Sequence, residues 1–308
     1  MIRKIICAAL CLCLLLSAVA CKKEETALRG YSFEDDLGRT VTVSEPLRVA
    51  ALLGSFADLW MLAGGTVCAS ADDAWEDLGL KLPKETVNLG STHAPSKEQL
   101  FLSSPQLVLA SSKLSKHLEL REALDAAGIP VAYFDVSDFD SFLHVFKILT
   151  DITGRGDLYE LHGEGQRARI DALLERNRAQ QPQRVLVLRA SSTSIRAKNS
   201  DGTMLGGMLR DFGCINIADS DAMLLEHLSL ESIALQNPHK LFFVEAGDHS
   251  EEIRLFVEKT FVENPLWQSL DAVKNGEVYF MEKELYNLKP NASFALAYEK
   301  LEGILYEK

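Results

Sequence analysis

Residues 96–105 read SKEQLFLSSP and precede the apolar run 107–110, while residues 229–238 read SLESIALQNP and precede the apolar run 241–244. Both follow the pattern S-x-E-x-[LI]-x-L-x-x-P. Serine caps a helix N-terminus, glutamate in the first turn meets the positive end of the helix dipole, and proline stops the helix. Each stretch therefore predicts a short helix before a buried strand. Unrelated helix-to-strand connections often use similar capping and stop residues, which could explain the match. The identical spacing of all shared positions instead favours two lobes of one design.

Apolar runs rich in β-branched residues alternate with helical patterns around these two stretches. The expected strands are 48–53, 67–70, 87–89, 107–110, 131–136, 185–188, 215–217, 241–244 and 278–281. The expected helices of the first half are 56–63, 97–102, 118–126 and 141–152. Such alternation is typical of a parallel sheet with helices on its faces. The sequence thus predicts an α/β fold with two Rossmann-like lobes.

A charged stretch at 158–180 separates the two halves, with few apolar positions. It is too polar for a core helix, but it suits a helix that runs along the surface between two lobes, and Pro182 is expected to end it. From N- to C-terminus, the expected organisation is a lipoprotein signal peptide at 1–20, a tether at 21–30, an N-terminal lobe at 31–155, a connecting helix at 156–182 and a C-terminal lobe at 183–308.

The N-terminus has the pattern of an export signal. Arg3 and Lys4 precede an apolar run at 5–20 that stops abruptly at Cys21. The run is short for a transmembrane helix, which needs about 20 apolar residues. The small residues at its end fit an ordinary secretory cleavage site, and, directly before Cys21, they also resemble a bacterial lipobox in which Ala18 replaces the usual leucine. We interpret Cys21 as the lipidated N-terminus of the mature chain.

Composition excludes several classes of function. A formal net charge of −12, without a basic patch, argues against nucleic-acid binding. Of six cysteines, cleavage leaves Cys21, Cys68 and Cys214, so no disulfide framework is expected, and the last two are interpreted as buried free thiols. The histidines show no metal-ligand spacing, so no metal site or cofactor is predicted. No nucleophile elbow or phosphate-binding loop is present; an exported hydrolase remains the alternative from another class.

Several motifs in a fixed order carry a family resemblance from about Tyr31 to the C-terminus. They are DLGRTVTV at 36–43, PLRV at 46–49, the Ser96-x-Glu98 pair with PQLVL at 105–109, GIPV at 128–131, and NPLWQSLDAVKNGEVY at 264–279. Together they resemble the periplasmic-type binding proteins of ABC importers for ferric siderophores, haem and cobalamin. Gln106 stands where that family usually has aspartate, at a structural position.

The resemblance implies a class III fold, in which a single long helix joins the lobes, and a non-enzymatic protein outside the cytoplasm, anchored to the cell membrane by lipid at Cys21. Its partners would be a small-molecule ligand and an ABC permease. An iron chelate such as a ferric siderophore is the first choice of ligand, and haem or a cobalamin-type corrinoid is the alternative. The resemblance also implies a two-point dock of exposed glutamates against permease arginines, for which Glu119 in the first lobe and Glu251 or Glu252 in the second are candidates at helix N-termini.

Ligands of open parallel sheets meet the loops beyond the carboxyl ends of the strands. Arg196 and Lys198, on a polar loop after the strand that ends near 189, could neutralise an anionic chelate, or they could be solvated surface charges. Trp75 and Tyr286 could stack on a flat ligand or pack against their own lobe. His93, at a strand end, could ligate iron or hydrogen-bond a ligand, or it could be an ordinary loop histidine.

Overall fold

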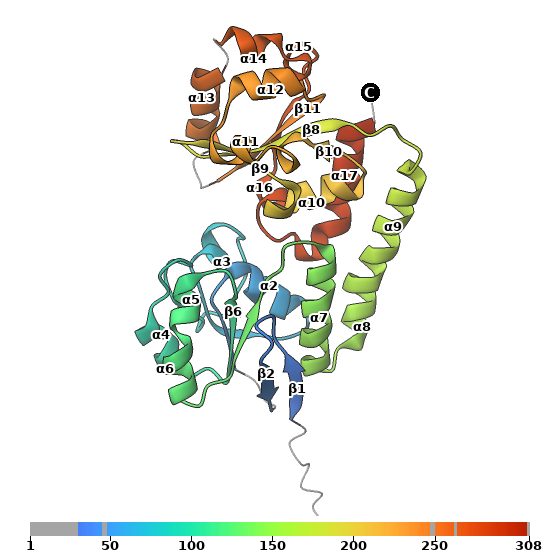
Figure 1. Ribbon diagram of the computed structural model, residues 1–308. Helices are drawn as coiled ribbons and strands as arrows, with labels where there is room; N and C mark the ends of the chain where they lie inside the picture. The colour runs from blue at the N-terminus through green and yellow to red at the C-terminus, as the bar shows by residue number, and fades with distance from the viewer. Residues whose placement is uncertain (1–29, 45–47, 247–249, 262–263, 307–308) are drawn as a thin grey trace, which may run out of the picture.

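The computed structural model describes residues 30–44, 48–246, 250–261 and 264–306. The expected signal peptide, Cys21 and all of the expected tether except Gly30 lie outside these residues. The described chain forms two lobes, one above the other, joined along one side by a long helical connector (Figure 1). The lobes and the connector match the fold that the sequence predicts. Among the described residues, no helix is both long enough and apolar enough to cross a membrane.

The N-terminal lobe is built on a parallel five-stranded sheet in the order β5-β4-β3-β6-β7. Its strands are β3 (Val49–Ala51), β4 (Val67–Ser70), β5 (Val87–Asn88), β6 (Leu107–Ser111) and β7 (Val131–Phe134). The helices are α2 (Gly54–Leu62), α3 (Asp73–Glu76), α4 (Lys97–Leu102), α5 (Ser115–Glu119), α6 (Arg121–Ala126) and α7 (Phe139–Thr153), and a hairpin of β1 (Tyr31–Glu34) and β2 (Thr40–Val43) precedes the sheet. The strands β3, β4, β6 and β7 lie where the apolar runs predict them because they are buried almost throughout, whereas the edge strand β5 is partly exposed.

The C-terminal lobe repeats this plan with the sheet order β10-β8-β11-β12, and β9 is added antiparallel to β8. Its strands are β8 (Arg184–Ala190), β9 (Ile195–Lys198), β10 (Ile215–Asn216), β11 (Lys240–Glu245) and β12 (Val278–Met281). Its helices are α10 (Met204–Asp211), α11 (Ala222–Glu226), α12 (Leu230–Gln236), α13 (Ser250–Phe261), α14 (Pro265–Ser269), α15 (Asp271–Lys274), α16 (Lys283–Tyr286) and α17 (Phe294–Tyr306), with 3-10 turns η3 (Ser200–Gly202), η4 (Ile217–Asp219) and η5 (Asn291–Ser293).

The repeated sequence pattern forms equivalent elements in the two lobes. Ser96 caps α4 by accepting a hydrogen bond from the backbone N–H of Gln99, and Ser229 caps α12 through the N–H of Ser232. Each helix leads into an inner strand of its sheet, β6 or β11. The structure therefore confirms that this pattern marks corresponding positions of two similar lobes.

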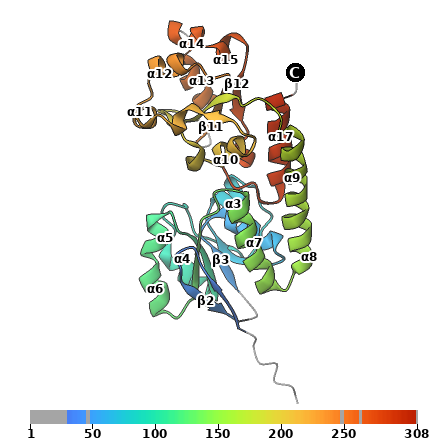
Figure 2. The ribbon, with the colours of Figure 1, turned by 45° about the vertical axis from the view of Figure 1, so that its right-hand side comes forward.

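The connector is one continuous helical segment made of α8 (Gly156–Tyr159), the π-helical turn η2 (Glu160–Glu164) and α9 (Gly165–Asn177). It ends at Asn177, before Pro182, so the expected C-terminal bound is too long. The connector runs along the surface between the lobes, and one of its faces packs against a second helix. The C-terminal helix α17 lies along α9 (Figures 1 and 2), and Ile170 and Leu173 are buried.

Ion pairs reinforce the packing of α17 on α9. Arg169 Nη2 lies 2.7 Å from Glu299 Oε1, and Arg176 pairs with Glu302. A two-helix bundle resists bending more than a single helix does, because bending would require the packed side chains to slide past one another. The structure thus supports the expectation of a stiff connection between the lobes.

The segment 287–294 carries the chain from the C-terminal lobe back onto the N-terminal lobe. Phe294 packs against Phe139 and Phe142 of α7, with ring centroids 5.1 and 5.0 Å apart. One continuous cluster of buried residues consequently includes side chains of both sheets, such as Phe134 and Val187. The two lobes therefore share one core, which also includes Ile170 and Leu173 of the connector.

Candidate ligand cleft between the lobes

The carboxyl ends of strands from both sheets meet between the lobes. Three adjacent cavities lie there, of about 300, 310 and 380 Å³. The 310 Å³ cavity is lined from both lobes, and it shares Arg189 with the 300 Å³ cavity. A cleft at this edge of two parallel sheets is the place where this class of fold binds ligands.

One part of the cleft is cationic. Arg189 on β8 and Arg196 on β9 are directly paired residues of the antiparallel ladder, and Lys198 follows on the same face of β9. All three line the 300 Å³ cavity, and no carboxylate of the described residues lies within ion-pair distance of them. Like charges directly opposite each other on neighbouring strands are destabilising. This arrangement therefore favours an anionic partner in the cavity.

The strand β9 corrects one expectation. Residues 191–198 were expected to form a loop, but the N–H of Ser191 donates to the carbonyl of Ser194 across 2.8 Å, and this turn folds residues 195–198 back onto β8. Arg196 and Lys198 are thus held on a strand, and a side chain on a strand is positioned more firmly than one on a loop.

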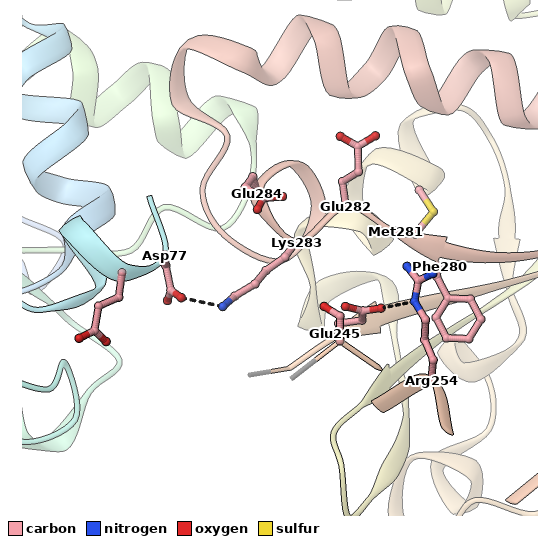
Figure 3. A pocket seen from close by; sticks show the side chains of 10 residues that line it. Asp77, Glu245, Arg254, Phe280, Met281, Glu282, Lys283 and Glu284 are labelled. Atoms are coloured by element: carbon pink, nitrogen blue, oxygen red, sulfur yellow. Dashed lines mark hydrogen bonds and ion pairs between the residues drawn. The ribbon is translucent and has the colours of Figure 1, made fainter. Parts of the chain in front are cut away.

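The neighbouring 380 Å³ cavity is mainly acidic (Figure 3). Lys283 of the C-terminal lobe reaches across the cleft to Asp77 of the N-terminal lobe, with 2.8 Å between Nζ and Oδ1. Arg254 lies 3.1 Å from the buried Glu245 and stacks over Phe280. The cations in this cavity already pair with carboxylates, in contrast to those beside β9.

A buried histidine joins the end of β6 to the loop after β5 in the N-terminal lobe. The ring of His117 accepts a hydrogen bond at Nδ1 from the N–H of Ser111 (3.0 Å), and Nε2 lies 2.9 Å from the carbonyl of Thr92. A neutral ring that accepts at Nδ1 donates at Nε2. Burial lowers the pKa of His117 to about 4, which keeps the ring neutral. The sequence gives no local signal for this bridge, because both partners are backbone groups and Thr92 is 25 positions away.

Ligand contact by Trp75 and by His93 stays a prediction. Trp75 is partly exposed on α3, the helix that also brings Glu76 to the acidic cavity, and His93 is exposed in the loop after β5. Neither side chain lines the three cavities described above.

The expectation that Tyr286 could stack on a ligand is wrong. It is only 2% exposed, and its hydroxyl donates to the carbonyl of Ala297 across 2.9 Å. Its ring packs in the shared core beneath α17, so it is not available to stack on a ligand.

Two of the three glutamates expected to contact the permease lie at a helix N-terminus, and the third does not. Glu251 and Glu252 lie exposed in the first turn of α13, as expected. Glu119 is the last residue of α5 and pairs with Lys116 at 2.7 Å, so its expected place at a helix N-terminus is wrong. The reason is that the predicted helix 118–126 breaks at Leu120 into α5 and α6. A docking role for any of the three stays a prediction.

Neither thiol lies in the described cavities. Cys214 is buried, and burial raises its pKa to about 11, whereas Cys68 is partly exposed; both are free. No group of three or more His, Cys, Asp or Glu side chains in the described part of the chain could hold a metal ion.

The fold and its cleft define a bilobal solute-binding protein, and the chain belongs to the periplasmic binding protein family, whose characteristic sequence is matched by residues 49–285. It is 26% identical over 262 residues to the Fe(3+)-citrate-binding protein YfmC of Bacillus subtilis, covering 82% of this chain and 78% of that protein. It is 23% identical over 232 residues to the high-affinity heme uptake system protein IsdE of Staphylococcus aureus strain MRSA252, covering 73% and 76% of the two chains.

Solved structures share the fold. An ABC transporter substrate-binding protein from Listeria monocytogenes superposes with a TM-score of 0.72 at 19% identity, over 86% of this chain and all of the other. The siderophore-binding protein BauB, solved with two molecules of acinetobactin and ferric iron, superposes with a TM-score of 0.73 at 18% identity, over 91% and 99% of the two chains.

Proposed function

We propose that this protein is an exported binding protein that captures an anionic iron chelate in the cleft between its lobes and delivers it to an ABC permease. The observation that carries the choice of ligand is the Arg189–Arg196 pair, with Lys198 beside it, facing a cavity without a carboxylate of the described residues to neutralise them. A chelate that presents carboxylate or phenolate oxygens would replace the missing counter-charge. Relatives named for ferric citrate and for a ferric siderophore complex are consistent with this chemistry.

Ligand binding by the purified mature chain tests the proposal. Ferric citrate, two ferric siderophores, haem and cobalamin are titrated separately while tryptophan fluorescence and visible absorption are recorded. We expect at least one anionic ferric chelate to bind with micromolar or tighter affinity, by analogy with other specific binding sites. Exclusive binding of cobalamin, or binding of none of the five, would refute the proposal. Turnover of ester, peptide or phosphate substrates would instead support the exported hydrolase.

Delivery requires a permease contact on each lobe, and we propose Glu98 and Glu231 as an alternative pair to Glu119, Glu251 and Glu252. Glu98 and Glu231 occupy the same position in equivalent helices, α4 and α12, and both are exposed. The same helices expose Leu102 (68%) and Leu235 (88%), an arrangement typical of a contact surface. The two similar lobes would thus present similar surfaces to a permease.

Charge reversal distinguishes the two sets of glutamates. The double variant Glu98→Lys with Glu231→Lys should abolish uptake of radioactive iron by cells while leaving ligand affinity in vitro unchanged. The matched control is Glu119→Lys with Glu251→Lys, which introduces the same charge. If the control loses transport and the first variant does not, the originally expected residues form the dock.

A further inference from the structure

The segment 287–291 places a lysine at the back of the cleft. Asn287 anchors one end of the segment by donating to the carbonyl of Glu245 (2.9 Å), and Asn291 anchors the other end on Asp58 of the N-terminal lobe (2.7 Å). Between them, Lys289 is partly buried with Nζ 5.9 Å from the centre of the Phe56 ring. Its side chain therefore lies where the two lobes meet.

Charges around Lys289 leave an excess of positive charge. Lys289 lines the 310 Å³ cavity together with Lys113, Asp135, Arg189 and Asp201. Asp135 lies 3.3 Å from Lys113, and Asp201 pairs with Arg210 outside the cavity. Arg189 and Lys289 remain, and no carboxylate of the described residues lies within ion-pair distance of Lys289.

The surroundings of Lys289 disfavour its charged form. Burial lowers the pKa of Lys289, and the more distant carboxylates of Asp135 and Asp73 only partly oppose this effect. Asp73 accepts a hydrogen bond from the N–H of Gly54, and burial raises its own pKa to about 6, so Asp73 is ionised above neutral pH. An anionic group placed in the cavity would favour the ammonium form, since an opposite charge nearby stabilises the charged state.

We propose that Lys289 is the deep anchor of the cleft for an anionic group of the ligand, and that its amine takes up a proton from solvent when this group binds. The inference rests on the proposed function, because it assigns the chemistry by which an anionic chelate would be held. In the fraction of the empty protein whose amine is neutral, Nζ gains one proton from solvent and becomes an ammonium that donates to the ligand oxygen. Capture of the chelate is then coupled to pH, with tighter binding at lower pH.

The direction of this dependence follows from linkage. As pH rises through the lowered pKa of the empty cleft, more of the protein holds a neutral amine, which must be protonated before binding. Affinity should then fall by up to about tenfold per pH unit, the slope for one linked proton. Asp135, Asp201 and Arg189 line the same cavity, and the carboxylate of Asp73 acts on Lys289 from a greater distance. Lys113 is the second lysine of the cavity and therefore the residue to control for.

Calorimetric titration of the purified mature chain with ferric citrate tests this coupling. Titrations between pH 7 and pH 9.5, each in two buffers of different ionisation enthalpy, give the number of protons taken up per ligand bound. Lys289→Arg keeps a permanent cation, and Lys113→Arg makes the same change at the neighbouring lysine. Changes in the speciation of ferric citrate with pH are common to all three proteins and cancel in the comparison.

We expect the wild type and Lys113→Arg to take up more protons than Lys289→Arg, by up to one per ligand, while Lys289→Arg binds with a flatter pH dependence. Lys289→Met should weaken ferric citrate at pH 7 by tenfold or more. Equal proton uptake by the wild type and Lys289→Arg at every pH would overturn the inference, and this comparison stands even if Lys289→Met does not fold. Failure of the wild type to bind any anionic chelate of the panel is visible before a variant is made, and it would overturn the proposed function instead.

Discussion

Removal of the Asn291 side chain should weaken the junction between the lobes. Asn291 is completely buried, and its Nδ2 donates to the carboxylate of Asp58 (2.7 Å) and to the carbonyl of Ser55 (3.0 Å). Its backbone has φ = 45°, in the left-handed region. In Asn291→Gly both acceptors lose their donor while the backbone conformation stays accessible. A hydrogen bond to a charged group contributes about 1.5–3 kcal/mol and a neutral one about 1 kcal/mol, so the expected loss is about 2.5–4 kcal/mol.

Asn291→Ala should cost more than Asn291→Gly. The added Cβ disfavours the left-handed conformation by about 1–2 kcal/mol, which brings the expected loss to about 3.5–6 kcal/mol. Guanidinium unfolding of the mature chain, followed by far-UV circular dichroism and by fluorescence, measures both variants against the wild type. The order wild type, glycine, alanine from most to least stable is the expected result.

The pH dependence of this loss provides a sharper test. Burial raises the pKa of Asp58 above its ordinary value of 3.8, and the hydrogen bond from Asn291 opposes this rise. Without Asn291 the folded-state pKa rises further, so the free energy of unfolding falls more steeply as pH increases above 3.8 through the folded value. The loss in Asn291→Gly should therefore be larger at pH 7.5 than at pH 4. An equal loss at both values, or stability equal to that of the wild type, would refute the role assigned to this hydrogen bond.

Three further perturbations test other parts of the molecule. Arg196→Ala should weaken an anionic iron chelate by about 1.5–3 kcal/mol, roughly tenfold to more than a hundredfold in Kd by calorimetry, and leave a neutral corrinoid unaffected; unchanged affinity for every anionic candidate would make Arg196 a solvated surface charge. His117→Gln should flatten the acid side of the stability profile. The folded pKa near 4 lies below the ordinary 6.5, so wild-type unfolding free energy should fall by about 3 kcal/mol as pH drops from 6.5 to 4, and identical acid profiles for the two proteins would contradict this. Cys21→Ser should release the protein from the membrane fraction or leave it uncleaved, whereas an unmodified N-terminal Cys21 in the mass spectrum of the cell-derived protein would refute lipid anchoring.

The cationic cavity shows the limit of reading sites from the sequence. Arg196 and Lys198 were recognisable as cations near a strand end, but Arg189 was placed only at the end of a strand. Its importance comes from the register of β9 against β8, which sets Arg189 opposite Arg196. Register depends on a four-residue turn at Ser191–Ser194 that has no glycine or proline to signal it.

The sequence by itself determined the elements whose causes are local. Helix caps such as Ser96 and Ser229, and runs of buried residues such as 107–110 and 241–244, act within a few neighbouring positions, so strands, short helices and the likeness of the two lobes were readable from the chain. The connector was recognised for the same reason.

Only the tertiary structure decided which side chains the lobes share and which the cleft exposes. Tyr286 is buried because α17 covers it, and Lys289 faces the cleft because the segment that carries it is fixed to Glu245 at one end and to Asp58 at the other. Asp58 is more than 200 positions away from Lys289 in the chain. Burial and electrostatic environment are sums over neighbours in space, and for these residues most of those neighbours are distant in sequence.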